Sequence, residues 1–159
     1  MKKIALMLAL FAAAGVMMLP GKVLATAATK IDLFQDTSVG GGEPIDMVGP
    51  TGFGFVNFNQ NGDSDLRIVV SLKNAEPNTT YQGAYLVCGP AHNAACGFID
   101  VGELTTNGQG NGTAQMWVDV ETLQASPFGP GAQTDHFDLI GPAGDIYAVT
   151  GLDYEVPAL

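Results

Sequence analysis

The stretch that decides the fold is Tyr81 to Val120, YQGAYLVCGPAHNAACGFIDVGELTTNGQGNGTAQMWVDV. It contains three runs of strand-forming residues. A loop between Cys88 and Cys96, the only cysteines of the chain, joins the first two runs, and a turn rich in glycine and asparagine joins the last two. Short connections of this kind join antiparallel neighbours. The stretch therefore predicts a β-meander of three consecutive strands.

The rest of the chain also consists of strand-like runs separated by turn residues. Asp65 to Ala75 alternates apolar and polar residues, as a half-buried antiparallel strand does. Segments rich in glycine and proline separate the other predicted strands, which are residues 31–34, 52–60, 136–140 and 145–156. Seven or eight strands, short turns and no helix predict an all-β fold, an antiparallel β-sandwich with Greek-key or immunoglobulin-like connections. A small barrel or a jelly roll is the alternative.

The first residues predict export. Lys2 and Lys3 precede an uncharged apolar run from Ile4 to Leu19, which Pro20-Gly21 breaks, and Val23-Leu24-Ala25 places small or compact residues before a cleavage site. This is the pattern of a Sec-type signal peptide cleaved after Ala25. The run is shorter than the roughly 20 residues that a membrane span needs. We therefore expect a signal peptide at residues 1–25, one β-sandwich domain at residues 26–159, and a secreted or periplasmic protein with no membrane partner after cleavage.

Charge narrows the choice of partner. The whole chain has a formal net charge of −10, and residues 26–159 keep only Lys30, Arg67 and Lys73 against all sixteen acidic residues, a net charge of −13. Nucleic acid is excluded because its phosphates require many basic side chains. A protein or a glycan at the cell surface remains as a partner, and the sequence leaves the oligomeric state open.

The two cysteines predict a disulfide, because exported proteins pass into an oxidising compartment. The alternative is zinc, since Cys88, His92 and Cys96 have the spacing C-x3-H-x3-C and His136 could supply a fourth ligand. The disulfide is favoured, and bridged cysteines have no thiolates to offer a metal. No cofactor is therefore predicted.

A second metal candidate lies around Asn61-Gly62. The candidate calcium ligands there are Asn57, Asn59, Asn61, Asp63 and Asp65. The match to an EF-hand loop is poor, because it begins with asparagine and has Ile68 where that loop has a glutamate. Asparagine and aspartate also suit the end of a β-hairpin, which is the preferred interpretation.

His136 and Asp138 are the candidates for a reactive pair. On a strand they point to the same side, so the carboxylate would orient the imidazole for catalysis or for metal binding. The sequence has neither a G-x-S-x-G motif nor a third histidine. Carboxylate pairs such as Asp119 and Glu121 are expected to be solvated strand-edge residues. No catalytic residue is predicted, and His136 and Asp138 are kept as binding candidates.

Aromatic residues form the last candidate site. If several are exposed, they would make a sugar-binding platform, although such residues more often fill a sandwich core. Phe128 is predicted to be exposed, because proline and glycine flank it in a loop. The full set is Phe53, Phe55, Phe58, Tyr81, Tyr85, Trp117 and Phe128.

The segment AEPNTTY at residues 75–81 places a proline turn before a tyrosine. This spacing resembles the corner of fibronectin type III domains, in which the tyrosine hydroxyl bonds back to nearby backbone. The tryptophan found early in those domains is missing, since Trp117 is the only one. The chain as a whole resembles small exported bacterial β-sandwich proteins, immunoglobulin-like or fibronectin type III-like. That resemblance implies a fold and transfers no site residue.

These observations favour an exported non-catalytic module with a structural or interaction role at the cell surface or in the periplasm. A carbohydrate- or metal-binding module is the alternative, and a hydrolase centred on His136 is a third. In a fibre-forming variant of the first hypothesis, residues 31–34 would add to the sheet edge of a neighbouring molecule.

Overall fold

The computed structural model describes residues 28–37, 49–60, 65–89, 96–125, 128 and 131–155. In this part of the chain the elements are β1 (Thr29–Asp36), β2 (Thr51–Gln60), β3 (Leu66–Leu72), β4 (Thr80–Cys88), β5 (Cys96–Thr105), β6 (Gly112–Val118), α1 (Val120–Ala125), β7 (Gln133–Ile140) and β8 (Ile146–Glu155). The predicted all-β class is confirmed. Residues 1–27, which hold the predicted signal peptide, lie outside the described residues.

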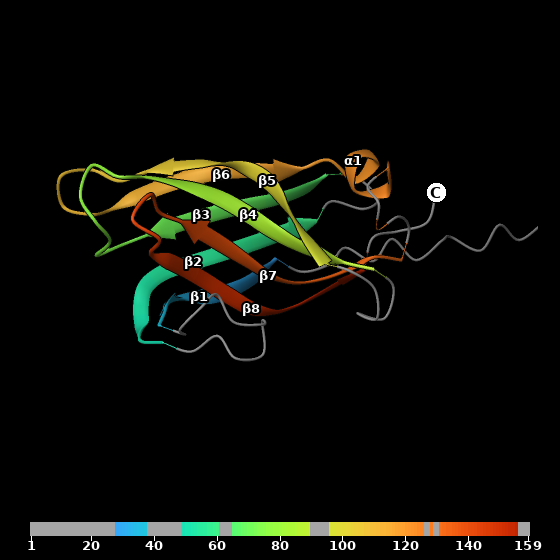
Figure 1. Cartoon of the computed structure of the whole chain (residues 1–159), viewed down its shortest axis with the longest axis horizontal. Helices are drawn as coiled ribbons and strands as arrows, with labels where there is room; N and C mark the ends of the chain where they lie inside the picture. The colour runs from blue at the N-terminus through green and yellow to red at the C-terminus, as the bar shows by residue number, and fades with distance from the viewer. Residues whose placement is uncertain are drawn as a thin grey trace, which may run out of the picture.

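The strands form one antiparallel sheet in the order β5-β4-β7-β8-β1-β2-β3-β6. The sheet curls until it is nearly closed like a barrel (Figure 1). Its two edge strands, β5 and β6, lie beside each other without a ladder of backbone hydrogen bonds among the described residues, and we call this gap the seam. The predicted division into two sandwich layers is not confirmed, and the architecture is closer to the barrel alternative.

The predicted meander is correct in its first half only. β4 and β5 pair along their whole length, from Thr80 with Thr105 to Cys88 with Cys96. β6 follows β5 across the seam and takes its backbone partners from β3. The meander prediction failed here because a short turn makes two strands neighbours but does not guarantee their hydrogen bonding.

Side chains close the seam. Met116 of β6 points into the barrel, and a Cβ atom added at Gly83 would lie 2.5 Å from its sulfur atom. Farther along, Leu123 of α1 is fully buried in the core, and the Phe128 ring lies against Gly97 at the start of β5. The helix was not predicted. Asp119 caps it by accepting hydrogen bonds from the Glu121 backbone N–H and the Thr122 hydroxyl.

The barrel interior is the hydrophobic core. β3 shows the predicted alternation, with Leu66, Ile68, Val70 and Leu72 buried and Arg67 exposed. Aromatic rings fill the centre: Phe58 meets Phe137 edge to face at 6.1 Å, and Tyr81 meets Tyr147 in the same way at 5.6 Å. The apolar face of each strand therefore points inward, and its polar face forms the outer surface.

The corner before β4 has the predicted tyrosine contact. The Tyr81 hydroxyl accepts a hydrogen bond from the Glu76 backbone N–H at 3.2 Å, five residues upstream. The Thr106 hydroxyl donates to the Glu76 carbonyl at 2.6 Å and accepts from the Thr79 N–H at 2.9 Å. Gly110 has φ +73°, and a Cβ atom there would lie 2.0 Å from the Ala75 carbonyl oxygen. The corner and the β5–β6 turn thus pack directly against each other.

The first strand extends beyond the predicted residues 31–34. β1 pairs with β2 on one side and with β8 on the other, so it lies inside the molecule's own sheet. Of the predicted residues 31–34, Ile31 and Asp32 pair with β2, and Phe34 pairs with both β2 and β8. In the described part of the chain, no helix has the length and apolar character needed to cross a bilayer.

Candidate functional site

The outer surface of β1, β2, β3 and β6 carries polar and aromatic side chains in register. The strand pairing places them in three rows across the strands: Asn59–Arg67–Trp117, Lys30–Asn57–Val69–Gln115 and Asp32–Phe55–Ser71–Thr113. Neighbouring strands lie about 4.8 Å apart, and successive rows about 7 Å apart. We call this surface the β1–β2–β3–β6 face. It is broad and shallow, and none of its side chains is fully buried.

Trp117 is the large apolar side chain that this face exposes to solvent. Its side chain is 54% exposed, and Phe98 at 55% is the other large apolar side chain exposed in the described residues. Trp117 lies directly opposite Arg67, whose guanidinium carbon is 5.8 Å from the centre of the ring. Gln115 accepts hydrogen bonds from the same guanidinium group when its amide is oriented to satisfy both groups. The indole ring is thus held in place beside a fixed cation and an amide.

A second cation lies over an aromatic ring on the same face. The Lys30 Nζ atom is 4.4 Å from the centre of the Phe55 ring, and both residues are partly or fully exposed. Lys73 directly follows β3 and is exposed, and its backbone N–H donates to the Phe53 carbonyl just beyond the β2–β3 ladder. All three basic residues of segment 26–159 therefore lie on this face or at its edge.

The face continues into an open groove of about 620 Å³ where β3 ends and β6 begins. Its walls include Lys73, Asn74, Asn107 and Asn111. The Asn107 Oδ1 atom accepts from two backbone N–H groups of its own turn, and the Asn111 Oδ1 atom accepts from the Asn74 N–H. These bonds fix the side chains with their oxygens turned to the backbone. Within the described residues, neither Nδ2 amide has a hydrogen-bond partner, so both are donors for a ligand.

The structure brings His136 and Asp138 together, as the strand spacing predicted. The His136 Nε2 atom is 3.5 Å from Asp138 Oδ2, and both residues are only 3% exposed. The Phe98 ring meets the imidazole edge to face at 5.7 Å. Asp138 Oδ1 is buried and has no hydrogen-bond partner among the described residues. Both residues alternate along β7 with the core residues Phe137 and Leu139, so the pair lies on the opposite side of the strand, beside the exposed Phe98 ring.

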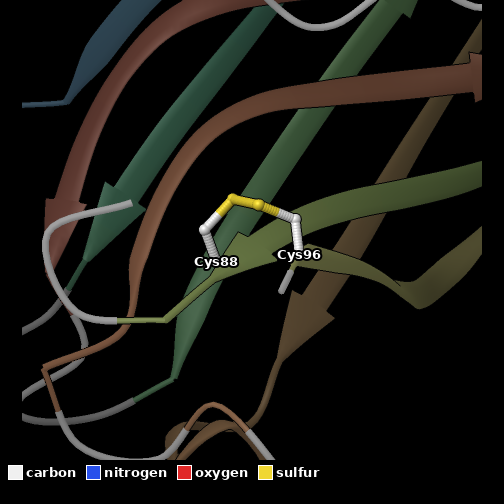
Figure 2. The surroundings of a disulfide bond; sticks show 2 residues. All are labelled: Cys88 and Cys96. Carbon is white, nitrogen blue, oxygen red and sulfur yellow. A yellow bond between two sulfur atoms is a disulfide. The ribbon is translucent and has the colours of Figure 1, made fainter. Parts of the chain in front are cut away.

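The cysteine prediction is confirmed. Cys88 and Cys96 form a disulfide, and the described residues contain no free cysteine (Figure 2). The two residues are direct partners at the end of the β4–β5 hairpin. With both sulfur atoms bonded to each other, no thiolate remains for zinc. His92 lies outside the described residues.

The calcium candidates are only partly described. Asn57 and Asn59 point outward on the β1–β2–β3–β6 face, and Asp65 is exposed just before β3. Asn61 and Asp63 lie outside the described residues. Within the described ranges, no group of three or more histidine, cysteine, aspartate or glutamate residues is placed to hold a metal ion.

Most of the other candidates pack into or against the core. Phe128 is half-buried and packs against the core, in contrast to the exposed position predicted for it. Phe53, Phe58, Tyr81 and Tyr85 also belong to the core or pack against it. Asp119 caps α1 with Glu121 in its first turn, so this pair is not a free strand-edge pair. Of the aromatic candidates, Trp117 and the half-exposed Phe55 remain at the surface.

Sequence reasoning did not assign Arg67, Gln115 or Lys30 to a site. The alternation in β3 predicted that Arg67 points outward, and the same parity in GTAQMWV places Gln115 and Trp117 on one side of β6. The missing information was the pairing of β3 with β6, which are separated by two strands in the sequence. No protein-family model, curated protein or solved structure matches the chain, so its own residues carry the functional argument.

Proposed function

We propose that the protein is an exported non-catalytic module that binds carbohydrate at the cell surface or in the periplasm. The observation that carries this proposal is Trp117, more than half exposed on a sheet face of fixed polar side chains. Tryptophan and arginine are among the residue types most enriched at binding hot spots, and Trp117 lies directly opposite Arg67 on this face. Carbohydrate binding would be the interaction role that the sequence analysis favours.

The chemistry of the face suits a sugar. A sugar ring has an apolar C–H face, which stacks on an aromatic ring, and a rim of hydroxyl groups that need donors and acceptors. Trp117 supplies the ring. Arg67, Gln115 and the asparagines of the groove supply hydrogen bonds around it. A protein partner would require several apolar anchors at the centre of its interface, and this face offers one exposed ring beside the half-buried Phe55.

We also propose that the protein is exported and has no catalytic activity. The burial of His136 and Asp138 supports a non-catalytic role, because a general acid or base must reach its substrate. The Cys88–Cys96 disulfide is compatible with an exported protein and adds to the evidence of the N-terminal signal pattern.

We also propose that Greek-key connections join the strands. If β5 and β6 count as neighbours across the seam, four strands follow the spatial order β3-β6-β5-β4. Counted backwards along the chain, β6, β5 and β4 are three consecutive neighbouring strands, and β3 returns to lie beside β6. This is the Greek-key order. The strand order thus supports the predicted connections, in a barrel or in a flattened, sandwich-like form.

A polysaccharide panel tests the proposed function. The purified protein is run through native gels containing neutral or acidic polysaccharides, and retardation measures affinity. We expect Trp117→Ala to weaken binding at least about tenfold, as loss of a central aromatic anchor does. Phe98→Ala is the matched control, because Phe98 is equally exposed but lies on β5 against His136. It should bind like the wild type.

Two results would refute carbohydrate binding. One is the absence of retardation by every polymer of the panel. The other is a wild-type dimer in size-exclusion chromatography that Trp117→Ala converts to a monomer, with no polysaccharide bound. That result would assign the exposed ring on edge strand β6 to self-association.

A further inference from the structure

We infer that the carbohydrate ligand is an uncharged, linear polysaccharide that binds along its chain, from Trp117 to the groove lined by Asn107 and Asn111. This inference rests on the proposed function and specifies the class of its ligand. Two observations support it beyond the exposure of Trp117. They are the balance of charge on the β1–β2–β3–β6 face and the line of hydrogen-bonding side chains along β6.

Charges of the two signs balance on this face. Three basic side chains lie in its rows or just beyond them: Lys30, Arg67 and Lys73. Three exposed carboxylates do the same: Asp32, Asp65 and Asp119. Residues 26–159 as a whole contain sixteen acidic side chains against three basic ones. The face is therefore locally neutral on a strongly acidic molecule.

Local neutrality decides which ligands suit the face. A polyanion would approach through the negative field of the whole molecule and would meet as many carboxylates as cations at contact. A polycation would be brought next to the Arg67 guanidinium group. An uncharged ligand avoids both repulsions. Its hydroxyl groups can accept hydrogen bonds from Arg67 while Gln115 and the Trp117 ring keep that group in place.

Hydrogen-bonding side chains continue from Trp117 along β6. Gln115 and Thr113 follow at alternate positions and are exposed on the same side of the strand. Asn111 is next in this alternation, and it lines the groove together with Thr113. Six positions of extended chain separate Trp117 from Asn111, a distance of about 20 Å. The line thus begins with an apolar ring and continues with uncharged donors and acceptors.

The length of this line indicates a polymer. A single sugar stacked on Trp117 is too short to reach Asn111, so one ligand contacts both residues only if it contains several sugar units. In the groove, the Nδ2 groups of Asn107 and Asn111 are donors for its hydroxyl groups. The groove is open and the face is shallow, so neither encloses the end of a chain. The site therefore suits an internal segment of a linear polysaccharide.

The charge of the ligand is tested with two matched pairs of polymers. Hydroxyethyl and carboxymethyl cellulose share one backbone, and methyl-esterified and free polygalacturonate share another. Neutral galactomannan and arabinoxylan complete the panel, and titration calorimetry at physiological salt measures affinity. In a pair that binds, we expect the neutral polymer to bind at least about tenfold more tightly than the charged one. Equal or tighter binding of the charged polymer would overturn the inference.

The length of the site is tested with the disaccharide and the hexasaccharide of the neutral polymer that binds best. We expect the hexasaccharide to bind at least about tenfold more tightly. Trp117→Ala should weaken binding of both. Asn111→Asp keeps the oxygen that accepts from the Asn74 N–H and removes the Nδ2 donor. It should weaken binding of the hexasaccharide about three- to tenfold, as loss of one hydrogen bond does, and leave the disaccharide unaffected.

Gln109→Glu is the matched control for Asn111→Asp. Gln109 is exposed in the same turn, and the residues that line the groove do not include it. Its replacement adds one negative charge, as Asn111→Asp does. The control should bind both oligosaccharides like the wild type. An equal loss in the two variants would mean that the added charge weakens binding, which overturns the path along β6.

The remaining outcomes separate this inference from the proposed function. If only charged polymers bind, and Trp117→Ala abolishes their binding, the ligand is not neutral and carbohydrate binding still stands. If the two oligosaccharides bind equally and both require Trp117, the extended chain is overturned and carbohydrate binding again stands. If no polymer of the panel binds, the inference and the proposed function fail together.

Discussion

Thr106 ties the corner before β4 to the turn after β5. Its side chain is 3% exposed, and its hydroxyl group bonds to the backbone of both Glu76 and Thr79. These residues lie about thirty positions upstream, so one hydroxyl fixes two distant segments. A buried group of this kind matters most through the partners that it would leave unsatisfied if it were removed.

Replacing Thr106 tests this role. Thr106→Val keeps the shape of the side chain and removes the hydroxyl, so the Glu76 carbonyl and the Thr79 N–H both lose a partner. We expect the free energy of unfolding to fall by about 1–3 kcal/mol in urea titrations. Thr105→Val is the control, since the Thr105 hydroxyl bonds only to that of Thr80 in an exposed position. Equal losses in the two variants would contradict the assigned role.

Ionisation of Tyr81 makes the free energy of unfolding depend on pH in the alkaline range. Burial raises the pKa of its hydroxyl well above the ordinary value of 10.0, and a hydrogen bond to the Asp145 carboxylate raises it further. Burial also raises the pKa of the neighbouring Tyr147. Below pH 10 both the folded and the unfolded chain keep the Tyr81 proton. Above it the unfolded chain ionises first, so this contribution to stability is lost as pH rises toward the folded-state pKa.

The expected slope is that of one proton. Above roughly pH 10, Tyr81 should lower the free energy of unfolding by about 1.4 kcal/mol per pH unit. Tyr81→Phe removes the contribution of Tyr81 to the slope and keeps that of Tyr147. The free energy of unfolding of the variant should therefore fall less steeply with pH than that of the wild type. Denaturant titrations at a series of alkaline pH values measure both slopes. Parallel curves for wild type and variant would show that Tyr81 does not titrate differently in the two states.

At the scale of elements, the disulfide fastens the end of the β4–β5 hairpin. The two cysteines are eight positions apart, and closing a loop of this length restricts the unfolded chain by about 2.5 kcal/mol. We expect reduction to lower the stability of the wild type by about this amount. Cys88→Ser/Cys96→Ser should have the lower stability from the start and should not respond to reductant. A double variant as stable as the oxidised protein would contradict the prediction.

Local signals in the sequence were sufficient for most single strands. The alternation of Leu66, Ile68 and Val70 identified β3 and its buried side, and the proline turn before Tyr81 identified the corner contact. The short helix α1 gave no such signal. Its six residues are too few for a periodic pattern, and its position depends on the buried Leu123 and on the Asp119 cap.

The partnership of strands could not be predicted, because it is decided by contacts far apart in the sequence. β3 pairs with β6, and β4 pairs with β7, although both pairs are separated by other strands. The β1–β2–β3–β6 face depends on this pairing. The sequence alone could identify Trp117 as an outward residue, but only the sheet order places it beside Arg67.

At the scale of the whole molecule, the strong negative charge was visible in the composition, but the positions of the charged side chains on the surface were not. Phe128 shows the same limit. Its proline- and glycine-rich surroundings predicted exposure, but the seam leaves space beside Gly97 that an aromatic ring fills. Loop composition predicts where the chain turns, while burial depends on the gap that the closed sheet leaves.

The seam also gives this molecule a preferred place to open. β8, β1 and β2 have backbone partners on both sides, whereas β5 and β6 each have a partner strand on one side only. Met116, Leu123 and Phe128 hold the closure by packing, and packing contacts can separate without breaking the ladder. Breathing motions of the barrel should therefore begin at this line.

Hydrogen–deuterium exchange would reveal such an opening. Backbone amides of β5 and β6 that face the seam should exchange at least about tenfold faster than those of β1 and β2, which require global unfolding. Uniform protection around the barrel would contradict this expectation. The same asymmetry has a consequence for recognition: Trp117 stands on the strand at the opening line, so a ligand bound to it would slow exchange across the seam as well as beneath itself.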